Sequence, residues 1–269
     1  MSGILFTAAF GFYAVGLFHS AAGFLTWRNL FFKVAFISVL IGFGFHTVFL
    51  VAKGIELSFY PPTGMKLSLA FFAWTVVLCF LIAYFRYRIQ ALGLFLLPLV
   101  AAMMLSTVFV KESAIPDILR SSWVYIHSTC MFLAYGMFFV TFIASVLYLL
   151  QVRELKSKKP KTFFYELPSL VVLDDLFFKF LTAGFTFMTA GMLFGVVWAE
   201  QQWVTGWYRD PKVIAAGTTW VIYLILIYLR ASAGWRGKRV AWMSLCGFVS
   251  VLFTYLGARL LGGQHIFLQ

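Results

Sequence analysis

A tryptophan-rich stretch, residues 198–220, carries the residue types in this chain that are best suited to ligand chemistry. Tryptophan is common at the membrane–water interface, because its ring is apolar while its N–H needs water or a partner. Anchoring needs fewer rings than this stretch contains, and flat aromatic surfaces beside a few charges suit a large, flat, amphipathic ligand. An aromatic belt with a short loop explains the same composition, so both interpretations stay open. The four rings belong to Trp198, Trp203, Trp207 and Trp220.

The histidines offer a second kind of chemistry. His127 and His265 each stand near one end of an apolar run. Neutral imidazole is a good iron ligand, so two such side chains could hold the iron of a flat macrocycle from both faces. His46 falls inside an apolar run, where an ionisable group indicates a functional site. A single histidine more often hydrogen-bonds to a neighbouring helix, so a structural role is open for each of them.

The elements that position these residues are expected to be membrane helices. The chain is 62% hydrophobic and only 11% charged, whereas a soluble domain carries roughly 25% charged residues. Apolar runs of about 20 residues predict an all-α polytopic membrane protein with about eight transmembrane helices in one domain, residues 1–269. No soluble basic domain carries the net charge of +12, which excludes nucleic-acid binding. The expected spans are 4–26, 34–52, 67–85, 92–110, 123–150, 177–199, 214–229 and 240–261.

The basic residues are divided unequally between the two sides of the predicted bundle. Fourteen Lys and Arg residues fall on one set of loops and seven on the other. An excess of Lys and Arg marks the cytoplasmic face, so both termini and the tryptophan-rich segment are expected to face outward. The predicted location is the cell inner (cytoplasmic) membrane, with the thylakoid as the plastid counterpart. His127 and His265 then fall on the same face as the tryptophans.

Two short patterns predict local contacts of the sixth span. Gly191 and Gly195 form a small-xxx-small pair, which is typical of a close helix–helix contact. Asp174 and Asp175 stand just before the apolar run, and we interpret them as an N-terminal helix cap that also complements the helix dipole.

The order of these motifs resembles that of the cytochrome c assembly proteins, the group that includes CcsA, HemX, CcmC and CcmF. The tryptophans at 198, 203 and 207, the segment 210–212 and the pair 219–220 fall in register with the tryptophan-rich motif of that family. The segments that end at His127 and His265 resemble the two that carry its external haem-ligand histidines.

The resemblance implies a haem-binding membrane protein of cytochrome c biogenesis. Such a protein delivers or presents haem b at the outer face of the membrane for attachment to apocytochrome c. It implies that His127 and His265 ligate the iron, and that a CcsB/ResB-like membrane protein is the partner in a haem-attachment complex. The residues expected to bind the rest of the haem are Trp198, Trp203, Trp207, Asp210 and Trp220.

One departure concerns a second haem site inside the membrane. CcsA proteins place a histidine in the helix after the tryptophan motif, and ungapped register from Trp220 places Tyr228 there. Tyrosine can ligate ferric haem, but hydrogen bonding or packing is also expected. His46 matches a histidine often seen in the second span of this group, and it is the other candidate for this site.

Two other functions are compatible with the sequence. A HemX-like regulatory membrane protein would bind haem without transferring it and would influence haem biosynthesis through a partner. The missing membrane histidine favours this alternative. A small-molecule transporter with an aromatic gate is a further class, but no inverted repeat is evident. The sequence has no P-loop, GxSxG or HExxH motif, so an ATPase or hydrolase has no support.

Overall fold

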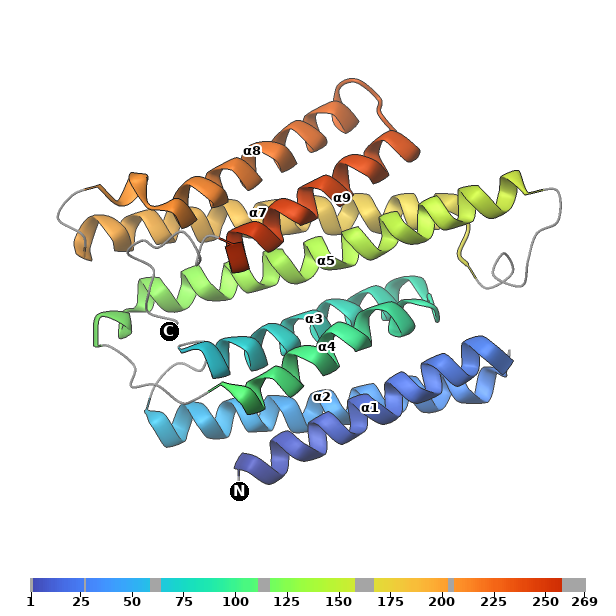
Figure 1. Ribbon diagram of the computed structural model, residues 1–269, viewed down its shortest axis with the longest axis horizontal. Coiled ribbons are helices and arrows are strands. Elements are labelled where there is room, and N and C mark those ends of the chain that lie inside the picture. The colour runs from blue at the N-terminus through green and yellow to red at the C-terminus, as the bar shows by residue number, and fades with distance from the viewer. Residues whose placement is uncertain are drawn as a thin grey trace. The chain divides into compact units, whose positions relative to one another are not determined.

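The protein is helical in all the parts that its structure, a computed structural model, describes (Figure 1). These parts contain helices and connecting turns but no strand, which confirms the prediction of an all-α protein. The predicted ligands His265 and Trp203 lie outside the described residues. The structure describes residues 2–26, 28–58, 64–110, 117–157, 167–202 and 206–257.

The first of two compact units, Met1–Ser113, is an up-and-down arrangement of helices. Consecutive helices run in opposite directions, with α1 packed along α2 and α3 along α4, while α4 also lies against α1 (Figure 1). The described helices of unit 1 are α1 (Ser2–Thr26), α2 (Asn29–Leu57), α3 (Met65–Tyr87) and α4 (Leu92–Phe109).

The second unit, Ala114–Gln269, is built on the long pair α5 and α7. Helix α9 packs against α5 and α8, and consecutive helices again alternate in direction (Figure 1). The described helices of unit 2 are α5 (Ser122–Lys156), α7 (Leu170–Gln202), α8 (Pro211–Ala231) and α9 (Lys238–Leu252), with short turns η1 (Asp117–Leu119), η2 (Trp207–Arg209) and η3 (Phe253–Gly257). One domain over residues 1–269 stays a prediction.

Seven of the described helices, α1 to α5, α7 and α8, are long and apolar enough to cross a membrane. Lipid tails cannot hydrogen-bond to backbone N–H and C=O groups, whereas a helix pairs these groups within itself. A helix of about 20 residues is long enough to span the hydrocarbon core. The expected eighth span begins as α9, whose 15 residues continue into the π-helical turn η3. The chain is therefore a multi-pass membrane protein, and the last part of the predicted span 240–261 lies outside the described residues.

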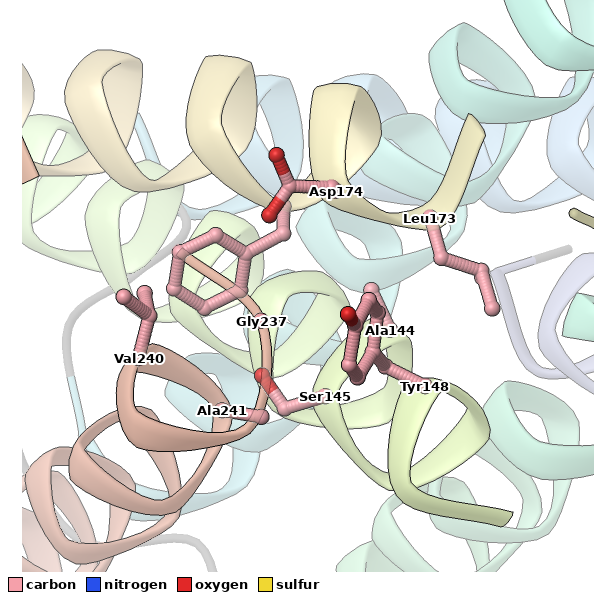
Figure 2. Close-up of a pocket in the computed structure, with 9 residues that line it drawn as sticks. Ala144, Ser145, Tyr148, Leu173, Asp174, Gly237, Val240 and Ala241 are labelled. Atoms are coloured by element: carbon pink, nitrogen blue, oxygen red, sulfur yellow. The ribbon is translucent and has the colours of Figure 1, made fainter. Parts of the chain in front are cut away.

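The predicted helix cap at Asp174 is wrong. Helix α7 begins earlier, at Leu170, and the backbone N–H of Val172 donates to the Ser169 hydroxyl at 3.4 Å. Asp174 instead accepts two hydrogen bonds from Arg230 of α8, at 2.9 and 2.7 Å, beside a small pocket of about 10 Å³ between α5, α7 and α9 (Figure 2). An ionisable group in a membrane helix needs a partner of opposite charge. The acidic residue therefore marks an ion pair rather than the start of the helix.

Candidate functional site

His127 lies in the second turn of α5, at the end of unit 2 where α5 begins, α7 ends and α8 begins (Figure 1). We call this the tryptophan end, because Trp198 and Trp207 lie at the same end. The opposite end, where α5 stops and the turn between α8 and α9 lies, we call the basic end. His127 and the described part of the tryptophan-rich segment thus occupy one end of one unit.

The backbone of α7 fixes the imidazole of His127. Its Nδ1 lies 2.7 Å from the carbonyl oxygen of Gly191. A carbonyl oxygen only accepts, so Nδ1 carries the proton and Nε2 holds the lone pair in the neutral ring. Metal-binding histidines have this arrangement, because donation from the other nitrogen fixes the tautomer and the orientation of the ring. The geometry of His127 therefore fits an axial iron ligand.

Two glycines of α7 allow this close approach. A Cβ on Gly195 would lie 2.6 Å from Nδ1 of His127, and a Cβ on Gly191 would lie 2.9 Å from the sulfur of Met131. The close helix contact predicted from the glycine pair is thus confirmed. The structure adds that Gly195 makes room for the His127 ring, while Gly191 makes room for Met131.

Trp198, Trp207 and Asp210 shape the connection from α7 to α8. Trp198 is buried in the last turns of α7. The indole N–H of Trp207 donates to Glu200 at 2.6 Å, which draws the turn η2 back onto α7. Asp210 is buried and accepts from the backbone N–H of Lys212 at 2.9 Å, so it caps α8, with a proline at the first helical position. Asp210 therefore has a structural role in addition to any contact with a ligand.

Trp220 packs on another face of α7. Its indole N–H donates to the Thr189 hydroxyl at 2.9 Å, and its ring stacks on Phe185 with 5.4 Å between centroids. Thr189 and Gly191 are two residues apart, which places them about 200° apart around the helix axis. Trp220 and His127 therefore form their hydrogen bonds on different sides of α7.

Tyr228 is 63% exposed on α8, on the outside of unit 2. Its role in a haem site stays a prediction. Tyr223, which the sequence analysis missed, is fully buried and stacks on Phe138 at 3.8 Å, and its hydroxyl has no hydrogen-bond partner within the described ranges. The spacing of residues in α8 could have indicated that Tyr223 is buried, because the buried side chains of this helix recur every three or four residues. They are Ala215, Thr219, Tyr223 and Leu226.

His46 forms a separate polar site inside unit 1. It is fully buried, and its Nδ1 lies 3.3 Å from the hydroxyl of Tyr13 on α1. Gly42 lets the tyrosine approach, since a Cβ there would lie 2.9 Å from the Tyr13 ring. Nε2 makes no hydrogen bond with a described residue. An unsatisfied buried nitrogen costs free energy, which keeps His46 a ligand candidate.

The fold and these contacts define a class: polytopic helical membrane proteins that hold an oriented histidine beside a tryptophan-rich helix connection. The sequence pattern of one family of this class, described as cytochrome C assembly protein, matches residues 2–265. The chain belongs to that family, and the resemblance seen in its motifs is confirmed.

Individual relatives agree with the family. The chain is similar to cytochrome c biogenesis proteins CcsA from three organisms. The protein of Heterosigma akashiwo (strain NIES-293 / 8280G21-1) is 28% identical over 246 residues, covering 77% of this chain and 76% of the relative. That of Prochlorococcus marinus (strain MIT 9215) is 28% identical over 264 residues, covering 88% and 85%. That of Chlamydomonas reinhardtii is 30% identical over 216 residues, covering 77% and 60%.

Proposed function

We propose that this chain acts in cytochrome c assembly by binding haem b at the tryptophan end of unit 2 and presenting it for attachment to apocytochrome c. The observation that carries the proposal is the hydrogen bond from His127 Nδ1 to Gly191, which leaves the lone pair of the imidazole on Nε2. Family membership supports haem as the ligand. The names of the relatives favour assembly over the HemX-like regulatory alternative.

In this proposal the chain binds and orients its cargo. His127 and His265 hold the iron from opposite faces of the porphyrin, while Trp198, Trp203 and Trp207 line the ring. Asp210 holds the start of α8 in place. The exposed guanidinium of Arg209, which lies 5.6 Å over the Tyr208 ring, is available for a charge-assisted hydrogen bond to a haem propionate.

The bond-forming chemistry belongs to haem and the apocytochrome. Each cysteine thiol of the apocytochrome adds its sulfur and hydrogen across a haem vinyl group, which forms a thioether without a leaving group. The chain contributes proximity, since a haem fixed by two imidazoles presents its vinyl edge in one orientation. A CcsB/ResB-like membrane protein is the proposed partner in this attachment complex. His46, with Tyr13, is the proposed second haem contact inside the membrane.

Gly195→Ala is expected to lower the amount of haem that copurifies with the protein. The added Cβ would meet the His127 ring at 2.6 Å, which displaces it from the Gly191 carbonyl. Loss of such an outer partner typically weakens metal affinity by about 10- to 100-fold. The haem-to-protein ratio in detergent measures the effect. Gly217→Ala is the control, because no atom lies within 4 Å of its Cβ. Equal haem loss in both variants would contradict the role of Gly195.

The proposed location is the cell inner membrane, with the tryptophan end facing outward. A topology reporter inserted at Lys159 is expected to report the cytoplasm, and one fused after Gln269 the outer side. The physical reason is the excess of basic residues on the loops that include Lys159. The opposite result at both positions would place the tryptophan end on the side where apocytochrome c is not assembled.

A further inference from the structure

The basic end of unit 2 carries a hollow that the proposed haem site does not use. The hollow lies on the turn between α8 and α9, has a volume of about 520 Å³ and is open to solvent. Three of its side chains are cationic and one is a tryptophan, and no acidic side chain is among the described residues that line it. The lining residues are Ala233, Gly234, Trp235, Arg236, Lys238 and Arg239.

The turn that forms the hollow has a defined conformation. Gly234 and Gly237 have φ angles of 65° and 71°, a region that side-chain-bearing residues rarely adopt, and the backbone N–H of Trp235 donates to the Leu229 carbonyl at 3.1 Å. Gly237 also lies against Tyr148 of α5 at the pocket of Figure 2, where a Cβ on Gly237 would be 2.9 Å from the tyrosine hydroxyl. The cationic side chains therefore stand on an ordered turn anchored to α5.

Like charges are held close together at this turn. The ammonium of Lys156, at the end of α5, lowers the pKa of Lys238, and desolvation lowers it further. The guanidinium of Arg239 lies 5.6 Å over the Trp235 ring, which keeps a third cation at the hollow. Such repulsion destabilises the folded protein until an anion joins the group.

The start of α9 adds to the same positive field. No side-chain cap satisfies its first N–H groups, and its first two residues are Lys238 and Arg239. The N-terminus of a helix carries a partial positive charge, which favours anions and disfavours cations. A ligand with negatively charged oxygens at the hollow would relieve both the helix end and the side chains around it.

We propose that this hollow binds the phosphate of an anionic phospholipid. Helix α8 is long and apolar enough to cross a membrane, so the turn that follows it lies where lipid headgroups meet water. Trp235 is the side chain type favoured at that level. Basic residues near the surface attract anionic lipid. The hollow is part of unit 2 alone, and the proposal does not depend on haem binding or on which side of the membrane the basic end faces.

The test uses the full chain in lipid nanodiscs of phosphatidylcholine with and without phosphatidylglycerol. Native mass spectrometry measures bound phosphatidylglycerol, and thermal unfolding measures its protection. Lys156→Gln/Lys238→Gln is expected to bind phosphatidylglycerol about 30-fold more weakly, since each basic residue at the surface contributes roughly a factor of five. In phosphatidylcholine alone the same variant should unfold no earlier than wild type, because the repulsion is gone. Arg28→Gln/Lys33→Gln removes the same charge from unit 1, whose residues do not line the hollow, and should bind like wild type.

Three results would overturn the proposal. Equal weakening in the two double variants would mean that net charge, and not the hollow, attracts the lipid. Equal protection of wild type by inorganic phosphate would identify a free anion as the ligand. Loss of copurified haem from Lys156→Gln/Lys238→Gln, with lipid binding unchanged, would assign the hollow to the haem carboxylates.

Discussion

His127→Ala/His265→Ala is expected to retain less than about a tenth of the wild-type haem after purification in detergent. Both proposed axial ligands are then missing, and losing even an outer partner of such a ligand costs about 10- to 100-fold in metal affinity. Either single variant should leave haem with five ligands or fewer and a shifted Soret band. Free imidazole should partly restore the spectrum of the single variants, because it can fill the vacated axial position.

His46→Ala compares the proposed second haem contact with the site at His127. It removes an imidazole that is buried in unit 1, and it should change haem content less than His127→Ala does. A double variant that copurifies with as much haem as wild type, with the same spectrum, would show that His127 and His265 are structural. Complete loss of haem from His46→Ala alone would instead make the site inside the membrane the principal one.

The helices could be predicted from sequence because lipid imposes a simple rule. Every backbone polar group in the hydrocarbon must be satisfied within its own segment, so an apolar run of sufficient length becomes a helix. Helix α4 begins at Leu92, where the sequence predicted it. The ends were less predictable where polar residues continue a helix beyond the apolar run, as α5 does to Lys156. The length of an apolar run reflects the thickness of the hydrocarbon core. It does not give the full length of a helix that continues into polar residues.

The candidate site could be predicted only as residue types. The sequence indicated that Gly191 and Gly195 contact another helix, yet it could not show that Gly195 makes room for the His127 ring. It grouped Trp220 with the other tryptophans, although its indole donates to Thr189 and its ring packs on Phe185, whereas His127 bonds to Gly191. Which face of a helix a residue occupies depends on the rotation of the helix against its neighbours. That rotation is set by packing between distant segments, which no local motif records.

Arg230→Met is expected to lower the free energy of unfolding by about 1.5–3 kcal/mol, because it removes hydrogen bonds to a charged carboxylate in a partly buried ion pair. The side chains of Arg230 and Asp174 are 10% and 25% exposed, and two hydrogen bonds of 2.9 and 2.7 Å join them. The guanidinium also lies 4.5 Å over the Phe178 ring, and this contact is lost with it. Denaturant unfolding of the detergent-solubilised chain, followed by tryptophan fluorescence, measures the change.

A matched control is the ion pair of the next acidic residue of α7, Asp175, with Lys179. Lys179 and Asp175 are joined at 2.8 Å, but their side chains are 51% and 45% exposed. An exposed pair contributes only about 0.2–1 kcal/mol, so Lys179→Met should cost far less than Arg230→Met. Arg230→Met/Asp174→Leu should recover most of the loss, because it also removes the partly buried carboxylate that the single variant leaves without its partner. Equal costs for Arg230→Met and Lys179→Met would mean that water reaches Asp174 in the folded protein, and the ion pair would then not be what holds α7 to α8.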